Sequence, residues 1–217
     1  MGFDWEPVIR YFPLLVKGAF FTILLSALSL VTGTCLGLVL AIFQLSKLKP
    51  LKIFSQYFVL IIRSIPLLLL LFLAFYIPPI IFKLDTSKFF TAWIALFLYS
   101  GVYATEIIRS GIQSIPKLQI ESGLSLGLNK RKVMRLIVLP QALKTIIPPY
   151  IGLYTVVIKD SSLASVIGYI ELARATRLGV MSTYRSFEFY SVALALYFLI
   201  CYPLSRYSKK AELRGGQ

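Results

Sequence analysis

The sequence has 217 residues, of which 58% are hydrophobic and 15% are charged, below the roughly 25% charged residues of a soluble domain. This composition excludes an ordinary soluble protein and predicts an all-α integral membrane protein. The formal net charge of +14 can reflect either nucleic-acid binding or the orientation of the chain in a membrane. The sequence has no His, so the usual zinc sites lack ligands.

Five apolar runs are candidates for helices that cross a bilayer, which takes about 20 residues each. In chain order they cover residues 12–45, 57–82, 89–108, 145–167 and 190–207. The first exceeds one straight crossing, so we expect its early part to tilt or to lie in the interface. The fourth is the weakest, because it carries two prolines near its start and two charges in its interior. The sequence thus predicts about five transmembrane helices in a single domain, residues 1–217.

The amino terminus does not resemble a removable secretory signal. Its acidic residues precede its first basic residue, Arg10, and no small-residue cleavage site follows. We therefore expect the first helix to stay in the mature protein. Cys35 and Cys201 fall inside apolar runs, where a thiol behaves as a small apolar residue, so they indicate neither a disulfide nor a metal site.

The basic residues lie unevenly on the two sides of the membrane. Residues 46–56, residues 109–144 and the tail from residue 206 together hold fourteen Lys and Arg, whereas the opposite side holds seven. With the acidic residues included, the net charges are +12 and +2. The positive-inside rule then predicts that the amino terminus lies outside and the carboxyl terminus lies in the cytoplasm. Orientation explains the excess charge, so we expect no nucleic-acid partner.

Four charges remain inside the spans and sum to zero, namely Arg63, Glu106, Lys159 and Asp160. Adjacent helical residues point about 100° apart, so Lys159 and Asp160 cannot pair with each other and need other partners. Intramembrane charges are costly unless they pair or line a polar cavity. Two interpretations stay open, a substrate path or a structural ion pair, and Arg63 can instead sit at the cytoplasmic surface.

Small residues in the first span predict a close helix contact. Gly33 and Gly37 form a G-x-x-x-G pattern, which lets two helix backbones approach each other. We expect this pattern to serve packing rather than transport.

The longest cytoplasmic stretch lies between the third and fourth spans and is bracketed by Pro116 and Pro140. Its apolar residues recur at helical spacing, and Gly127 allows a tight bend. The pattern predicts two short helices that meet near Gly127 and lie on the membrane surface.

This stretch resembles the cytoplasmic loop of the permease subunits of bacterial ATP-binding-cassette importers, in the polar amino acid branch. The loop of that family reads E-A-A, three residues, G, nine residues, I-x-L-P. Here Glu121-Ser122-Gly123 is followed after three residues by Gly127, and after nine more by Ile137-Val138-Leu139-Pro140. Ser122 and Gly123 replace the two alanines, and the glycine weakens its helix by about 1 kcal/mol. The likeness extends to residues 63–67, 106–112, 139–142 and 159–168.

The resemblance implies a coupling loop, about residues 109–142, that docks on a separate ATPase subunit. Its docking residues would be Glu121, Ser122, Gly123, Gly127, Ile137, Leu139 and Pro140, although Glu121 can also be read as a solvated loop acid. The chain has no G-x-x-x-x-G-K-[ST] phosphate loop, so the partner would use the ATP and this chain would bind no cofactor. No catalytic residue and no metal ligand is expected.

The resemblance also implies the setting of the protein. It would be a multi-pass protein of the bacterial inner membrane, and it would pair with an identical or similar second permease. An external substrate-binding protein would deliver a polar amino acid to it.

The presumed substrate path is formed by one residue of the second span and by several residues of the fourth span. These residues are Arg63, Gly152, Leu153, Lys159, Asp160, Ser161 and Ser162. Many relatives have an Asn and a polar residue at the positions of Gly152 and Leu153, and a Gln at that of Leu70. The departures leave fewer side-chain anchors, which argues against a strongly cationic substrate and raises the importance of the external binding protein.

Functions of two other classes compete with import. An ion-driven secondary transporter would usually have more spans and an inverted repeat, which is not evident here. A membrane-embedded enzyme would need a His, a clustered acid pair or a metal motif, and the sequence offers none of these.

Overall fold

The computed structural model describes residues 4–215, and it is helical throughout that range apart from short connections. The elements are α1 (Glu6–Leu45), α2 (Lys49–Ser64), α3 (Leu67–Phe82), α4 (Lys88–Gln113), α5 (Lys117–Ser125), α6 (Lys130–Val133), the π-helix η1 (Met134–Val138), α7 (Leu139–Asp160), the 3-10 helix η2 (Ser161–Ile167), α8 (Leu172–Thr183) and α9 (Ser186–Gly215). Residues 1–3 and 216–217 lie outside the described residues. They include the two chain ends, which the charge pattern predicts to lie on opposite sides of the membrane.

Among residues 4–215, four helical stretches are long and apolar enough to cross a membrane, namely α1, α4, Lys130–Ile167 and α9. The pair α2 and α3 makes a fifth span if it is counted as one, with a bend of 99° between its halves. The prediction of an all-α protein with about five spans is therefore confirmed.

The second span is not the continuous run of residues 57–82 that the sequence predicts. α2 begins at Lys49, well inside the predicted connector 46–56, and the chain breaks at Ile65 and Pro66. Pro66 lacks a backbone N–H and disfavours helical angles at the residue before it, and Ile65 is accordingly extended, with ψ at 124°. The proline thus divides the span into two helices.

α1 and α4 pack at close range through small residues. A Cβ at Gly37 would lie 2.8 Å from the Cβ of Ala104, which is nearer than real Cβ atoms approach. The Ser100 hydroxyl of α4 donates to the carbonyl oxygen of Ser29 in α1 at 2.9 Å. The packing role predicted for Gly33 and Gly37 is therefore confirmed.

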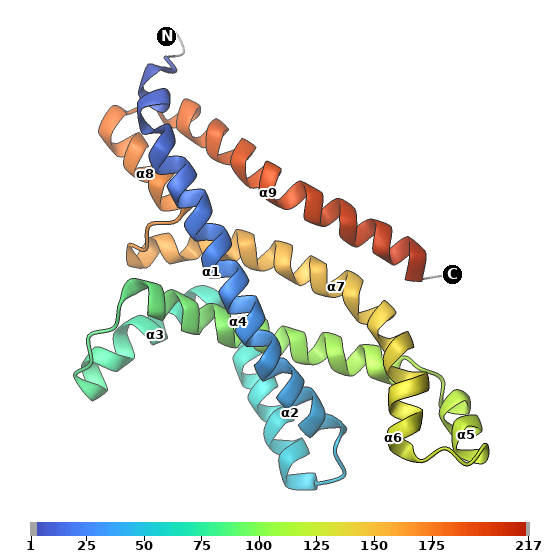
Figure 1. Ribbon diagram of the computed structural model, residues 1–217. Coiled ribbons are helices and arrows are strands. Elements are labelled where there is room, and N and C mark those ends of the chain that lie inside the picture. Colours follow the sequence, from blue (N-terminus) through green and yellow to red (C-terminus); the bar gives the residue numbers. More distant parts are fainter. Residues whose placement is uncertain (1–3, 216–217) are drawn as a thin grey trace.

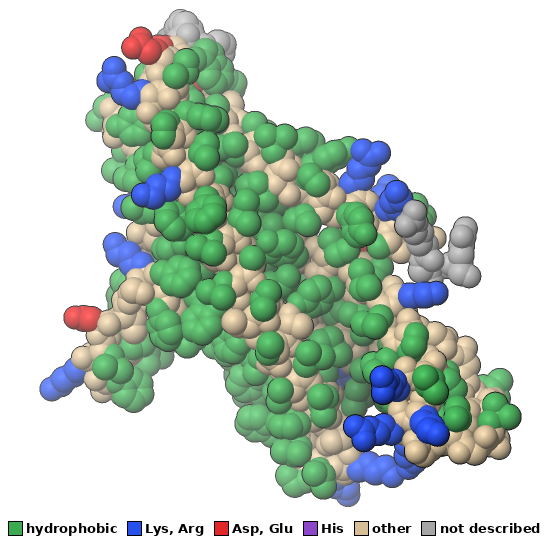
Figure 2. Space-filling model, viewed as in Figure 1, with side chains coloured by type: hydrophobic (Ala, Val, Ile, Leu, Met, Phe, Trp, Pro, Cys, Tyr) green, Lys and Arg blue, Asp and Glu red, His purple; other side chains and the backbone are tan. Residues whose placement is uncertain are grey.

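The arrangement separates the connections into two groups (Figure 1). The amino-terminal end of α1, the helix α8 and the α3–α4 connection lie along one side of the molecule, whereas the α1–α2 connection, α5, α6 and the end of α9 lie along the other. α7 packs on both α4 and α9, and α8 packs on α1. Much of the outer surface is apolar, as Figure 2 shows for one face, which suits contact with lipid.

Candidate functional site

α5 ends in a turn centred on Gly127. The Gly127 N–H donates to the Leu124 carbonyl at 3.0 Å, and the Leu128 N–H donates to the Gly123 carbonyl at 3.2 Å. These two bonds form a Schellman motif, which needs a left-handed residue, and Gly127 has φ at +81°. The side chain of Asn129 then caps the start of α6. The predicted meeting of two helices near Gly127 is confirmed, and its cause is this backbone conformation.

The second of these helices is not a separate short one as predicted, because α6 continues through η1 into α7. Pro140 explains the π-helical stretch between them. Its ring would collide with the carbonyl of Leu136 in a regular α-helix, and a π-helical widening just before the proline lets the helix continue.

Gly123 lets α5 approach the start of this long helix. A Cβ at Gly123 would lie 2.7 Å from Cδ1 of Ile137, so an alanine there would force Ile137 to move. The Gln141 side chain donates to the Gln119 side-chain oxygen at 2.7 Å and ties α7 to α5. Gly123 and Ile137, which the motif places fourteen positions apart, therefore form one packed contact.

The other motif residues face outward. Glu121, Ser122, Leu139 and Pro140 are exposed, and within residues 4–215 Glu121 forms no ion pair. Leu118 and Leu126 beside them are 72% and 82% exposed. Lys and Arg side chains gather over the α5–α6 region in Figure 2, and the sequence there supplies Lys130, Arg131, Lys132 and Arg135. The exposed acid, leucines and basic residues form a surface suited to a partner.

A second group of polar side chains lies along α4. Glu106 Oε2 lies 2.7 Å from Nη2 of Arg109 and 3.7 Å from Nη1 of Arg63, which comes from the end of α2. The Arg63 guanidinium also lies 5.1 Å from the centre of the Tyr103 ring. Arg63 and Glu106 are thus partners of each other, and neither contacts Lys159.

Two tyrosines connect this cluster to Asp160. The rings of Tyr103 and Tyr99, one helical turn apart on α4, have centres 4.7 Å apart. The Tyr99 hydroxyl lies near the carboxylate of Asp160 at the end of α7. We name the set of Asp160, Tyr99, Tyr103, Arg63, Glu106 and Arg109 the polar track.

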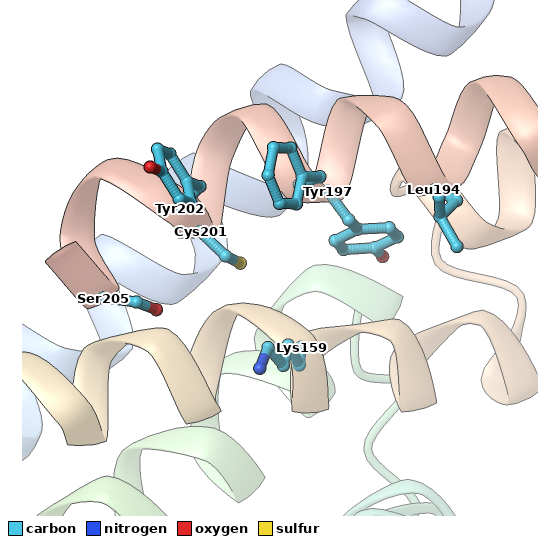
Figure 3. Close-up of a pocket in the computed structure, with 7 residues that line it drawn as sticks. Lys159, Leu194, Tyr197, Cys201, Tyr202 and Ser205 are labelled. Atoms are coloured by element: carbon cyan, nitrogen blue, oxygen red, sulfur yellow. The ribbon is translucent and has the colours of Figure 1, made fainter.

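Lys159 points away from the polar track. It lies beneath α9, in a groove of about 320 Å³ that Tyr197, Cys201 and Ser205 also line, as Figure 3 shows. Gly152 opens on a separate groove between α7 and α9. Lys159 and Gly152 therefore face grooves toward α9, whereas Asp160 faces Tyr99 on α4. The charge of Lys159 nevertheless acts on the Asp160 carboxylate.

The remaining predicted path residues are less accessible. Leu153 is packed in the core, and Ser161 is buried with its hydroxyl donating to the Ile158 carbonyl at 2.8 Å. Ser162 is half-buried. Of the predicted path residues, only Asp160 and Arg63 are brought together, through tyrosines that sequence reasoning missed. The spacing of Tyr99, Tyr103 and Glu106 on one helix face was the available signal.

A buried carboxylate fixes α8 against two other helices. Glu171 accepts hydrogen bonds from the backbone N–H groups of Ala173 and Arg174 at 2.8 and 2.7 Å, from the Tyr197 hydroxyl at 3.0 Å and from the Thr22 hydroxyl at 3.4 Å. Burial raises the pKa of Glu171 above its ordinary value of 4.5, and the four donors only partly oppose this shift. The contact joins α1, α8 and α9.

The sequence matches a known family over most of its length. Residues 33–209 match the model of the binding-protein-dependent transport system inner membrane component. The chain belongs to this family. The L-cystine transport system permease protein TcyB of Bacillus subtilis is 38% identical over 212 residues, which cover 97% of this chain and 90% of that protein. The glutamine transport system permease protein GlnP of Escherichia coli K12 is 32% identical, with 99% and 98% covered.

Solved structures agree with this assignment. The crystal structure of an amino acid ABC transporter with histidines contains a chain 33% identical to this one, with a TM-score of 0.91 over 99% of this chain and 100% of that one. A chain of the MetNI methionine ABC transporter in an inward-facing conformation has a TM-score of 0.72 over 95% and 98% at 19% identity, which shows a shared fold.

The family confirms the resemblance seen in the sequence. The chain is a permease subunit of an ATP-binding-cassette importer in the bacterial inner membrane, and ATP hydrolysis belongs to a separate subunit. Neither a membrane-embedded enzyme nor an ion-driven transporter is favoured.

Proposed function

We propose that the chain imports a polar amino acid, together with ATPase subunits, an external substrate-binding protein and a second permease that is identical or similar to it. The observation that carries this proposal is near-full-length similarity to TcyB and GlnP, which are named for L-cystine and glutamine transport. The ATP is used by the partner, and this chain binds no cofactor. The whole of residues 1–217 serves as one permease domain, with its amino terminus outside and its carboxyl terminus inside.

The coupling loop, about residues 109–142, docks on the ATPase subunit in this proposal. The exposure of Glu121, Leu118 and Leu126 supports it, since an unpaired acid beside exposed leucines suits a partner's cleft. Ser122, Gly127, Leu139 and Pro140 lie on or beside this surface, while Gly123 and Ile137 hold its two helices together. Closure of the ATPase would thereby move α5 and α7 as a unit.

The substrate crosses beside α4 and α7. Asp160 and Arg63 supply charges of opposite sign on the polar track, which suits a ligand with an ammonium and a carboxylate group. In this proposal Ser161 and Ser162 of η2 and Leu153 of α7 adjoin the path, whereas Lys159 and Gly152 face separate grooves toward α9.

Uptake into proteoliposomes tests the function. The chain is co-purified with its ATPase and binding protein, and labelled polar amino acids, L-glutamine and L-cystine among them, are supplied with the binding protein. We expect uptake of at least one amino acid that needs both ATP and the binding protein. Uptake by the purified chain alone without ATP, or no uptake of any polar amino acid by the full complex, would contradict the proposal.

A further inference from the structure

The helical run of α6, η1 and α7 changes direction between the labels α6 and α7 in Figure 1, and its first part is packed against the end of α4. Ala142 of α7 is buried in a small apolar core with Val138 of η1, and Ile146 packs against that core. Ile146 also lies so close to Gly111 of α4 that a Cβ there would collide with it. The run is therefore held at α4 as far as Ile146, and η1 lies within the held part.

The last part of α7 belongs to a second core. Leu153 and Val157 are buried in the main apolar core with residues of α1, α3 and α4, and Tyr150 packs against it. The hydroxyl groups of Tyr150 and Thr34 are hydrogen-bonded, which ties α7 to α1. The two ends of α7 are thus held by different sets of neighbours, and the stretch between them is short.

That stretch contains the residues that weaken a helix most. Pro148 and Pro149 have no backbone N–H, so the carbonyls of Lys144 and Thr145 lose their usual helical donors. Gly152 follows, and glycine inside a helix is less favourable than alanine because its backbone is freer. Outside its own helix backbone and chain neighbours, no atom of the described residues lies within 4 Å of where a Cβ on Gly152 would be. Close packing therefore does not explain this glycine.

α9 supplies the stretch with a hydrogen bond from outside the helix. The Ser208 hydroxyl donates to the carbonyl oxygen of Pro148 at 2.8 Å. In an α-helix the same carbonyl accepts from the N–H of Gly152, and a carbonyl oxygen has room for two donors. The Pro148 carbonyl therefore keeps a partner when the turn at Gly152 opens, which lowers the cost of opening it.

We propose that residues 147–152 form a hinge in α7, across which the part packed with α5 turns relative to the part that ends at Asp160. The inference rests on the proposed function and adds how the docked loop acts on the substrate path. α5 and α7 move as a unit as far as Ile146, and the hinge lets this movement tilt the outer part without tearing Leu153 from its core. Ile112 of α4, which packs against both cores, lies where the two parts meet.

Gly152→Ala tests the hinge, because it strengthens the helix and meets no other side chain. Gly152→Ser gives a helix propensity between those of Gly and Ala with a slightly larger side chain. Val156→Ala is the matched control, since Val156 lines the same groove as Gly152 and the change strengthens the same helix beyond the hinge. The wild type and the three variants are purified with the ATPase and binding protein and reconstituted.

We expect Gly152→Ala to melt at or above the wild-type temperature and to lose at least about fivefold in ATP-dependent uptake. Uptake by Gly152→Ser should lie between the two, and Val156→Ala should match the wild type. A stiffer helix with less transport distinguishes a hinge from a packing position, at which a larger side chain lowers stability and Ser harms at least as much as Ala.

Hydrogen exchange follows the hinge without any substrate. The backbone amides of residues 150–153 are compared in the nucleotide-free complex and in the complex trapped with ADP and vanadate. We expect their exchange rates to differ by at least about fivefold between the two states in the wild type, and by less in Gly152→Ala. The amides of residues 156–158, inside the second core, should exchange alike in both states.

Normal uptake by Gly152→Ala overturns the inference, and so does equal exchange of residues 150–153 in the two nucleotide states. A lower melting temperature of Gly152→Ala, with a loss of uptake that Gly152→Ser shares in full, assigns the glycine to packing and also overturns it. A wild-type complex that imports no polar amino acid contradicts the proposed function instead, and hydrogen exchange still decides whether the hinge exists.

Discussion

Glu171 is a single residue on which three helices converge. Its carboxylate caps α8 through two backbone N–H groups and also binds α1 through Thr22 and α9 through Tyr197. A buried acid that binds four donors keeps them satisfied, and leaving them unpaired would cost about 1–3 kcal/mol each. Glu171 therefore links the position of α8 to its own protonation state.

We expect this link to appear in the pH dependence of stability. Because burial raises the pKa of Glu171 above its ordinary 4.5, the folded protein keeps a proton that the unfolded chain has already released. The stabilisation is fully present below pH 4.5 and is lost as the pH rises through the folded pKa. The melting temperature in detergent should fall over that window, and Glu171→Gln should remove this part of the slope.

The control for this prediction is Glu212→Gln, which removes an exposed acid of α9. It should leave the pH dependence of the wild type unchanged. A melting temperature that rises with pH through the same window in the wild type, but not in Glu171→Gln, would show that the sign is wrong.

At the scale of elements, the sequence predicts the existence of helices better than their breaks. Hydrophobic runs predict the spans, and the G-x-x-x-G pattern predicts the α1–α4 contact, because both follow from local composition. Pro66 marks a possible break, but the 99° bend depends on partners far along the chain. Leu67 and Leu71 of α3 are buried in the same core as residues of α4. Arg63 at the end of α2 forms an ion pair with Glu106 of α4. Only the folded structure brings these groups together.

In the candidate site, too, the sequence predicts the features that depend on local spacing and misses those that depend on distant contacts. The spacing of Glu121, Gly127 and Pro140 is local, so the sequence predicts a turn between two helices at Gly127. The partner of Asp160 is not local, since Tyr99 is 61 residues away in the chain. The sequence alone allows several pairings of the four intramembrane charges. Arg109, which the charge pattern assigns to a cytoplasmic segment, also forms an ion pair with one of them, Glu106.

The α5–α6 turn offers a test that separates charge from backbone conformation. Gly127 has φ at +81°, a conformation that costs most other residues about 1–2 kcal/mol. Beyond its two chain neighbours, no atom of the described residues lies within 4 Å of where its Cβ would be. Asn and Asp both tolerate this conformation and have nearly the same shape. We expect Gly127→Asp to abolish ATP-dependent uptake, because it adds a charge at the proposed docking surface, and Gly127→Asn to keep most of it.

Abundance in the membrane should be normal for both variants, since the spans are untouched. Equal loss of uptake in Gly127→Asn and Gly127→Asp would assign the effect to the backbone instead of docking. Normal uptake by Gly127→Asp would remove the coupling role.

At the scale of the whole molecule, the fold and the charge pattern agree. Fourteen of the 23 basic residues fall in residues 46–56, in residues 109–144 and in the tail from residue 206. The α1–α2 turn, α5, α6 and the end of α9 belong to these stretches and lie on one side in Figure 1. The amino-terminal end of α1, α8 and the α3–α4 connection lie on the other. The difference between +12 and +2 is large for loops this short, so the first of these sides should face the cytoplasm.

Cysteine labelling of intact cells tests this orientation with two substitutions of nearly equal size. Ser125 at the end of α5 and Ser182 on α8 are both exposed, and each differs from cysteine by one atom. In a background that lacks Cys35 and Cys201, a membrane-impermeant maleimide should label Ser182→Cys from outside and leave Ser125→Cys unlabelled until the membrane is opened. Because both residues are solvent-exposed, a difference in labelling reports the side of the membrane rather than burial. Efficient labelling of Ser125→Cys in intact cells would reverse the orientation, and with it the assignment of the α5–α6 surface to the ATPase.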